Sequence, residues 1–379
     1  MKTTFRILTL IFTLLFCSGI NAQTKEEITA KIRAKGQKLN LKPVVGDLQS
    51  IDYSVSNRAY FLSFNNFDCN IYFKVNAPDA YAVLGEIFKL YDKMLWGDAV
   101  KGNDVRITRK NQKLFIGAPV GDEFSTPQKK GAGQHFDGGS IYWSQPTGAH
   151  EVHGNIRDKW KSLGWEKSFL GFPVTDETAT PDGYGKFNFF EGGAIYYHSN
   201  LGTFAVPKMI AEVWKKQGWE KGKIGYPVSD EIIKNNNAVQ KFEFGAVIST
   251  KAAPYQIIFN GTNRQRGLYS KWVETGAENS YLGDLVTPNR NYPKNPYQYF
   301  AEFQKGYIYE SFTKGTNKVD AFVIHKGPIF DYYASKKWEQ GYLGLPTSDE
   351  YNSGDGVAQN FQGGIIYYTK LQGVYEKKQ

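Results

Sequence analysis

The sequence predicts an α+β repeat protein that forms a closed, pseudo-symmetric ring of five to six modules, each with a helix, a Leu-Gly-Phe-Pro loop and a β-hairpin. One octapeptide recurs along the chain, which is typical of repeat architectures. The chain begins with a helix pattern, 26–39, and ends after a hairpin pattern, so each end supplies what the other lacks. Because one module cannot bury its apolar face alone, we expect the N-terminal helix to dock beside the last hairpin.

The octapeptide is best preserved as Leu-Gly-Phe-Pro-Val-Thr-Asp-Glu at 170–177. Further copies start near 116, 224 and 343, and a worn copy, Leu-Gly-Asp-Leu, starts at 282. Proline fixes its own φ and keeps the preceding residue extended, so the octapeptide cannot continue as a helix. We expect its glycines and prolines to set the loop backbone in the three clearest copies: Gly171, Pro173, Gly225, Pro227, Gly344 and Pro346.

A short helix is expected before each octapeptide. Ile156, Trp160 and Leu163 are spaced i, i+4 and i+7, which places them on one apolar stripe. Gly164 follows at once, where a left-handed residue would end the helix. The same stripes predict four core tryptophans: Trp160, Trp214, Trp272 and Trp338.

A β-hairpin is expected after each octapeptide. The runs 186–190 and 194–198 are rich in aromatic residues and flank a Gly-Gly pair, which favours a tight turn. Side chains alternate along a strand, so Tyr142 and Tyr196 should face away from Trp143 and Tyr197. The solvent-facing set would suit stacking on sugars, and we expect such contacts from Trp143, Tyr197, His198 and Tyr368.

The N-terminus has the layout of a cleavable signal peptide, with an apolar run at 7–16 and small or polar residues up to Ala22. The run is too short for a membrane anchor, which needs roughly 20 residues. We therefore expect a secreted, periplasmic or cell-envelope protein with no transmembrane segment after signal cleavage. Cys17 raises lipidation as an alternative, although Phe16 precedes it.

Three regions are predicted: the signal peptide at 1–22, an N-terminal helix with a degenerate first repeat at 23–115, and the clear repeats at 116–379. The alternative for 24–112 is an unrelated α+β cap. Cys69 is the one cysteine left after cleavage, and its aromatic surroundings predict a buried, unreactive thiol. Cleavage removes Lys2 and Arg6, so the formal charge falls from +9 to +7 (9 − 2). This excess reads first as solubility, and we expect no nucleic-acid partner.

These motifs resemble the LGFP repeat family, through Leu170 to Pro173 and the flanking segments 136–143 and 147–156. The resemblance implies an exported, envelope-associated protein. In that family the repeats often attach mycolyltransferases or peptidoglycan amidases to wall polysaccharide. This chain has no recognisable catalytic partner, so no enzymatic activity is carried over.

Catalytic and metal motifs are weak. The chain has no Gly-x-Ser-x-Gly elbow and no phosphate-binding glycine loop. His150-Glu151-Val152-His153 lacks the i, i+4 histidine pair of a metalloprotease helix, and on an extended strand His150 and His153 would face opposite ways. We expect no metal and no cofactor, and keep His150 as a candidate ligand contact.

The acidic pairs that end the octapeptides have two interpretations. Asp176, Glu177, Asp230 and Glu231 would grip sugar hydroxyls, or the aspartates would accept backbone N–H groups of their own loops. The leading prediction is a secreted, non-catalytic protein that binds cell-wall or other envelope polysaccharide through its repeats. The alternative is a protein-interaction scaffold presenting loops such as 98–113 and 251–265, and a hydrolase is the less favoured third.

Overall fold

The computed structural model describes residues 23–44, 52–54, 58–65, 68–96, 116–126, 128, 130–261, 265–292, 295–312 and 319–378. In these residues the chain folds into six α-helices and six four-stranded antiparallel sheets, so it is mostly β. It divides into two compact units, 1–123 with 135–137, and 124–134 with 138–379. The predicted signal peptide, Cys17 and the insertion at 98–113 lie outside the described residues.

The N-terminal unit contains helix α1 (Lys25–Lys38) and the first sheet. Thr24 caps α1 and forms a reciprocal capping box with Glu27. Ile28 and Ile32 are buried where α1 packs on β2, β3 and β4. The elements that complete this unit are β1 (Asp52–Ser54), β2 (Ala59–Phe64), β3 (Cys69–Lys74), β4 (Tyr81–Val83) and α2 (Gly85–Trp96).

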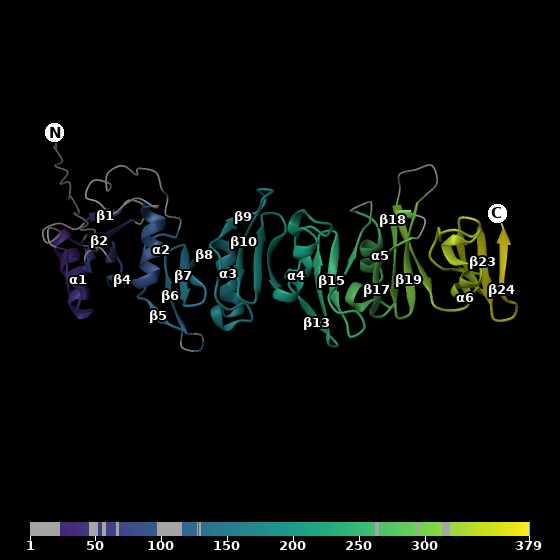
Figure 1. Ribbon diagram of the computed structural model, residues 1–379, viewed down its shortest axis with the longest axis horizontal. Coiled ribbons are helices and arrows are strands. Elements are labelled where there is room, and N and C mark those ends of the chain that lie inside the picture. The colour runs from purple at the N-terminus through teal and green to yellow at the C-terminus, as the bar shows by residue number, and fades with distance from the viewer. Residues whose placement is uncertain are drawn as a thin grey trace, which may run out of the picture. The chain divides into compact units, whose positions relative to one another are not determined.

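Five further sheets follow, each with its strands side by side in sequence order (Figure 1). Their strands are β5 (Phe124–Ser125), β6 (Gly131–His135), β7 (Gly139–Ser144), β8 (Gly148–His153), β9 (Thr178–Ala179), β10 (Gly185–Phe190), β11 (Gly193–His198), β12 (Gly202–Pro207), β13 (Ile232–Lys234), β14 (Asn237–Phe242), β15 (Gly245–Ser249), β16 (Gln256–Phe259), β17 (Leu285–Tyr292), β18 (Asn295–Phe303), β19 (Gly306–Phe312), β20 (Val319–His325), β21 (Tyr351–Ser353), β22 (Gly356–Phe361), β23 (Gly364–Thr369) and β24 (Gly373–Lys378).

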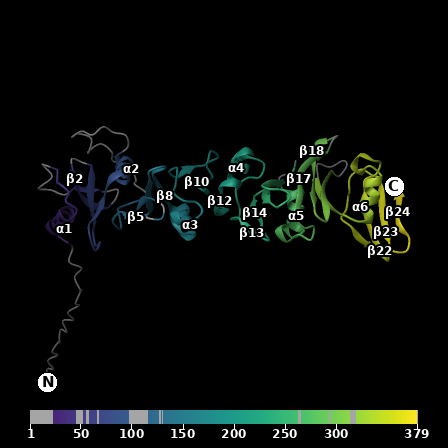
Figure 2. The same cartoon turned by 60° about the horizontal axis from the view of Figure 1, so that its bottom comes forward.

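In the second compact unit, a helix stands between successive sheets, and α6 packs on β20, β23 and β24 (Figure 2). These helices are α3 (Gly154–Leu163), α4 (Lys208–Lys216), α5 (Leu268–Glu274) and α6 (Pro328–Ser335). Each continues into a 3-10 turn: η3 (Trp165–Lys167), η4 (Trp219–Lys221), η5 (Ala277–Asn279) and η6 (Trp338–Gln340).

The helix predictions are confirmed at the ends of α3, α4 and α5, which left-handed glycines follow, and largely in their cores, whereas α6 ends at Ser335 and does not reach Trp338. Gly164 is left-handed (φ 102°) and ends α3 as expected. Trp160, Trp214 and Trp272 are at most 2% exposed. The prediction for Trp338 was wrong, because it lies in η6 and is 43% exposed, while Tyr333 takes the core position of α6.

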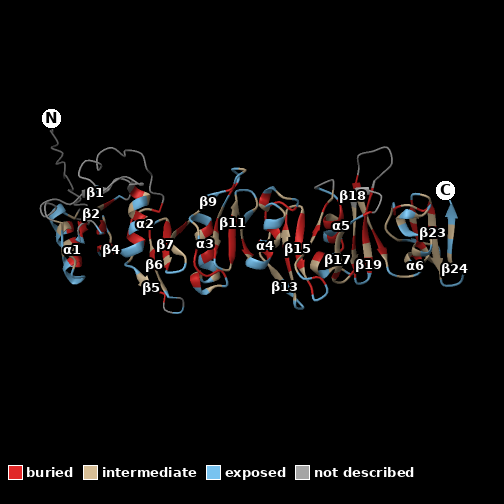
Figure 3. Ribbon diagram, viewed as in Figure 1, coloured by how far each residue is buried: buried red, intermediate tan, exposed pale blue. Residues whose placement is uncertain are grey.

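The predicted hairpins are the central strand pairs of larger sheets. Strands β10 and β11 pair as expected, with Asn188 opposite Ile195, but β9 and β12 flank them. Buried positions colour red along β11, whose first four residues, up to Tyr196, are buried, while Tyr197 stays half-exposed (Figure 3). A two-strand module was therefore wrong, since two outer strands complete each sheet.

The predicted closed ring was also wrong. Each sheet is open, and β24 pairs with β23 alone in its sheet. Helix α1 packs on β2, β3 and β4 of the sheet that follows it, so the predicted docking of α1 beside the last hairpin does not hold. The first helix does not need the last hairpin, because it already covers the sheet that follows it.

The octapeptide forms one repeated bend. Its glycines Gly171, Gly225 and Gly344 have φ values of 70°, 74° and 64°, a conformation that costs glycine little. The prolines two residues later form isolated β-bridges with the last residue of the second strand in the following sheet: Pro173 with Phe190, Pro227 with Phe242 and Pro346 with Phe361. Pro43 bridges Phe64 in the same way within the first sheet.

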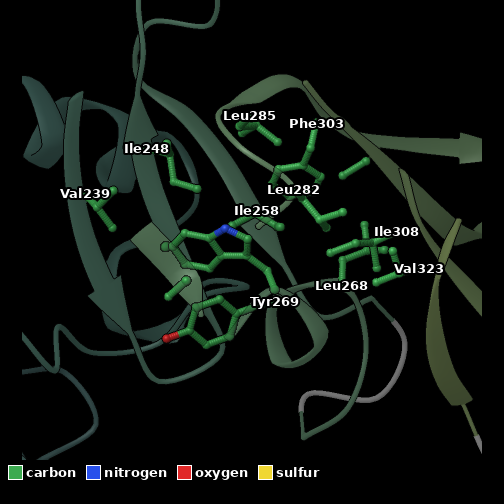
Figure 4. Packing of buried hydrophobic residues seen from close by; sticks show 14 residues of the cluster. Val239, Ile248, Ile258, Leu268, Tyr269, Leu282, Leu285, Phe303, Ile308 and Val323 are labelled. Atoms are coloured by element: carbon green, nitrogen blue, oxygen red, sulfur yellow. The ribbon is translucent and has the colours of Figure 1, made fainter. Parts of the chain in front are cut away.

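The cores are formed mainly where a helix and a sheet meet. One cluster joins Val239 and Ile248 with Leu268, Leu285 and further buried residues, as seen in Figure 4. Cys69 is buried as predicted, and burial raises the pKa of its thiol to about 11. In the described part of the chain, no helix is long and apolar enough to cross a membrane.

Candidate functional site

The recurring polar residues gather where one module meets the next. We call each α-helix with the sheet that follows it a module, numbered from the first (α1, β1–β4) to the sixth (α6, β21–β24). A junction is the region where the fourth strand of one module meets the octapeptide of the next. Every junction described below lies within one of the two compact units.

The aspartate of the octapeptide fastens the preceding module. Asp230 Oδ1 accepts the Ala205 N–H (2.9 Å), and Asp349 Oδ1 accepts the Val323 N–H (2.8 Å). Asp176 does the same for Glu151 (3.1 Å). The backbone interpretation of these aspartates therefore describes their contacts, but the N–H belongs to the neighbouring strand and not to their own loop.

A helix lysine neutralises this aspartate in alternate modules. Lys35 pairs with Asp122, Lys159 with Asp230, and Lys271 with Asp349. In the fourth module the equivalent helix residue, directly before the core tryptophan, is Val213. The acceptor at the next junction is then the neutral Asn289, whose Oδ1 accepts the Phe259 N–H (3.2 Å). At that junction neither the helix residue nor the loop acceptor carries a charge.

A buried amide makes a second link at several junctions. Gln240 Nε2 donates to the carbonyls of Ala205 and Ser229 (both 2.9 Å). Gln359 Nε2 donates equivalently to Val323 and Ser348 (both 2.8 Å). Because both amides are fully buried, these bonds satisfy carbonyls that water cannot reach.

The most strongly coupled charges lie between the second and third modules. His153 contacts Glu151 through Nδ1 (2.8 Å) and Glu177 through Nε2 (2.9 Å), and Lys186 also contacts Glu177 (2.6 Å). Burial lowers the pKa of His153, but the two carboxylates outweigh it and raise the pKa to about 9. Burial raises the pKa of Glu177, and His153 and Lys186 reverse this to a lowered value. The described residues hold no His, Cys, Asp and Glu group arranged for a metal ion.

The remaining predicted polar contacts are distributed over several modules. His150 contacts Asp176 through Nδ1 (3.1 Å) and the Thr147 carbonyl through Nε2 (3.0 Å). His198 Nδ1 accepts the Asn200 N–H (3.2 Å), and its ring lies 4.8 Å from that of Tyr226. Glu231 is half-buried, and burial raises its pKa.

The three predicted aromatic platforms share one position. Trp143, Tyr197 and Tyr368 all lie near the end of a third strand, opposite a residue of the fourth. All three are half-buried. Tyr197 and Tyr368 also pack against core clusters, which reduces the ring face that they offer to a ligand.

A second aromatic position, missed by the sequence reasoning, is more exposed. Phe169, Tyr281 and Tyr342 directly precede the leucine of an octapeptide and are 53%, 53% and 50% exposed. The backbone holds this position in place, since the Gly192 N–H donates to the Leu170 carbonyl (2.7 Å) and the Gly363 N–H to the Leu343 carbonyl (2.9 Å). The signal available was the recurrence of an aromatic residue just before the motif.

The end of the fourth strand supports two of these rings. The His325 ring lies 5.5 Å from that of Tyr281, and Lys378 Nζ lies 5.1 Å from the centre of the Tyr342 ring. In the fourth module the position is occupied by Lys223, whose Nζ lies 4.8 Å from the Phe259 ring. The residue before the octapeptide therefore contacts the end of a fourth strand even where the residue types differ.

A polar pocket of about 280 Å³ lies between the fourth and fifth modules. None of the predicted ligand contacts lines it. Its walls are given by Ile232, Lys234, Asn235, Asn237, Val239, Ile248, Thr250, Trp272, Ala277, Glu278, Asn279, Ser280, Gly283, Asp284 and Leu285.

Comparison with solved structures gives low similarity. An extracellular domain described as part of a one-component system of B. thetaiotaomicron shares 10% identity over 87% of this chain, with a TM-score of 0.15, and the chain spans 36% of its length. Virginiamycin B lyase from Staphylococcus aureus shares 9% identity over 89% of this chain and 87% of its own, with a TM-score of 0.12. A surface component of the type-IX secretion system of Porphyromonas gingivalis shares 12% identity over 87% of this chain and 46% of its own, with a TM-score of 0.12. No curated protein matches the chain.

The family comparison agrees with the repeated bend. The model of the LGFP repeat matches residues 116–168, 170–222 and 343–377. The first two matches each start with an octapeptide and run to the next 3-10 turn, and the third covers the octapeptide and sheet of the sixth module. The chain therefore contains three segments that match the LGFP repeat.

Proposed function

We propose that this protein is an exported, non-catalytic component of the cell envelope that binds polysaccharide through several modules at once. The observation that carries the proposal is the exposed aromatic position before the octapeptide, filled by Phe169, Tyr281 and Tyr342. Aromatic rings stack on the apolar faces of sugar rings, and Tyr adds a hydroxyl for hydrogen bonding. A platform repeated along one chain suits a polymer whose own units repeat.

Avidity would provide most of the affinity for the polymer. A single exposed ring gives weak binding, but linked sites on one polymer act at a high effective concentration. The acidic pairs support a structural role in this scheme, since their aspartates fasten neighbouring modules. The export signal expected at 1–22 supports the envelope location.

The test is retention of residues 23–379 on insoluble bacterial wall polysaccharide. We expect the wild-type chain to sediment with the polysaccharide and to be released by soluble fragments of it. The control is Tyr184→Ser, which removes an aromatic ring that is 70% exposed but lies outside the repeated position. Absence of retention on wall polysaccharides and capsules would remove the proposal, and a protein partner found by cross-linking would favour the scaffold alternative.

A further inference from the structure

The junction between the fourth and fifth modules has lost the aromatic packing that fills the junction before it. Between the third and fourth modules, Trp219 lies 6.3 Å from Tyr196, and Tyr196 stacks on Phe187 at 5.1 Å. The next junction has Ala277, Ile248 and Val239 at the corresponding places, as the strand register and the 3-10 turns show. All three changes are from a large aromatic residue to a small or aliphatic one.

A fourth change replaces a contact with a tyrosine ring by a hydrogen bond between an amide and a carboxylate. Tyr226, the third residue of its octapeptide, packs so closely on Gly185 that a Cβ there would lie 2.9 Å from the tyrosine ring. In the next junction the equivalent pair is Asp284 and Asn237, and Asn237 Nδ2 donates to Asp284 Oδ1 (2.8 Å). Both residues of this contact differ from their equivalents at the preceding junction. The Asn237–Asp284 hydrogen bond therefore joins the modules where the tyrosine ring is absent.

The pocket of about 280 Å³ occupies this altered junction. Its lining combines aliphatic side chains and the indole of Trp272 with amide, hydroxyl and carboxylate groups. Figure 4 shows Ile248 and Leu285 on facing elements of this region. The volume lies just below the range of about 300–1,000 Å³ that is typical of small-molecule sites, which suits one ring rather than a long chain.

The charges at the pocket cancel. Lys234 and Asp284 line it, as does Glu278, which is paired with Lys241 (2.8 Å). Two cations and two anions leave no net charge to select an ionic ligand. The amides, two hydroxyls and two carboxylates of the lining match the mixed donors and acceptors of a polyol.

We infer that this pocket binds a single neutral sugar ring, such as a terminal hexose of a glycan. The choice of a sugar rests on the proposed function, whereas the pocket itself does not. The altered junction lies in 223–342, which the LGFP repeat model leaves unmatched, so the site is a property of this chain and not of each repeat.

The experiment is a binding titration of residues 23–379 followed by NMR and calorimetry. The probes are the methyl glycosides of glucose, galactose, mannose and N-acetylglucosamine, with glucuronic acid, glucosamine and alanine as charged comparisons. A ligand of this size should bind with a dissociation constant on the order of 1 mM. We expect one neutral glycoside to bind and to shift the indole signal of Trp272.

Two variants locate the binding. Ala277→Trp restores the residue present at the two preceding junctions and should lower the affinity at least about 10-fold by occupying the pocket. Asp284→Asn keeps the size of the side chain but removes a carboxylate acceptor, and should weaken binding about 5-fold with an unchanged melting temperature. Tyr184→Ser should leave this binding unchanged.

Three outcomes would overturn the inference: no neutral glycoside binds, a charged probe binds more tightly, or Ala277→Trp binds as the wild type does. Binding of a glycoside without retention on polysaccharide would sink the proposed function alone. If the wild type and Ala277→Trp are both retained on polysaccharide and no glycoside binds, the inference about the pocket is wrong and the proposed function stands.

Discussion

At the scale of the residue, three junctions depend on an ion pair between a helix lysine and a loop aspartate. Lys159 is 18% exposed and faces Asp230, whereas Val213 stands at the equivalent place before the neutral Asn289. A partly buried ammonium without its carboxylate loses solvation and gains nothing in return. The two combinations therefore should not be interchangeable one residue at a time.

This predicts a compensating pair of substitutions. Asp230→Asn keeps an acceptor for the Ala205 N–H but leaves Lys159 unneutralised, and should lower the free energy of unfolding by about 1 kcal/mol, a small value because Asp230 is 45% exposed and screened by solvent. Adding Lys159→Val should recover most of this loss, as measured by urea unfolding. A double variant less stable than Asp230→Asn would show that the matched charges do not explain the pattern.

His153 gives a pH dependence at the same scale. Its folded-state pKa of about 9 lies above the unfolded value of 6.5, because Glu151 and Glu177 outweigh the effect of burial. The stabilisation is therefore complete below about pH 6.5 and is lost as the pH rises through about 9. We expect the free energy of unfolding to fall across this window, and His153→Gln to abolish that slope. An NMR titration midpoint for His153 at or below 6.5 would contradict the account.

At the scale of the element, the tight turn between the central strands positions the exposed aromatic residue. A Cβ on Gly192 would lie 1.9 Å from the Phe169 carbonyl oxygen, and one on Gly363 would lie 2.1 Å from that of Tyr342. The glycine pair thus serves the contact between hairpin and octapeptide as well as the turn. This explains why a Gly-Gly turn accompanies the motif.

Gly192→Ala should accordingly lower the free energy of unfolding by about 2 kcal/mol, since the backbone must shift to admit the methyl group. It should also weaken polysaccharide binding by displacing Phe169. The matched control is Gly121→Ala, where a Cβ would meet nothing within 4 Å. Equal melting temperatures for both variants would mean that the close approach is not a constraint.

Local patterns in the sequence predicted local structure well. The i, i+4, i+7 stripe and Gly164 predicted α3, and the aromatic runs around Gly192 predicted β10 and β11. The outer strands were missed because β9 has two residues and β12 reads as a connection to α4. Trp338 was misplaced because its helix ends earlier than its tryptophan, at Ser335.

At the scale of the whole chain, prediction was limited by contacts between modules. The ring followed from treating the first helix and the last hairpin as halves of one module, yet α1 has its own sheet. The pocket could not be predicted because it depends on Ala277, Asp284, Ile248 and their partners meeting across a junction. The worn motif at 282–285 was visible in the sequence, but it read as decay and not as a changed site.

The same scale carries the functional claim, because repeated platforms matter only if they act together. Each of Phe169→Ser, Tyr281→Ser and Tyr342→Ser removes one exposed ring and leaves the buried octapeptide leucine beside it unchanged. One substitution should cost a few-fold in affinity for a polymer. Loss of all three should remove the gain from avidity, which reaches 10²–10⁴ for linked sites.

The most direct test is the dissociation rate of residues 23–379 from immobilised wall polysaccharide, compared among the wild type, the three single variants and the triple variant. We predict a rate on the order of 100-fold faster for the triple variant, about 3-fold to 10-fold faster for each single variant, and no change for Tyr184→Ser. A triple variant that dissociates as slowly as the wild type would contradict multivalent binding through these modules.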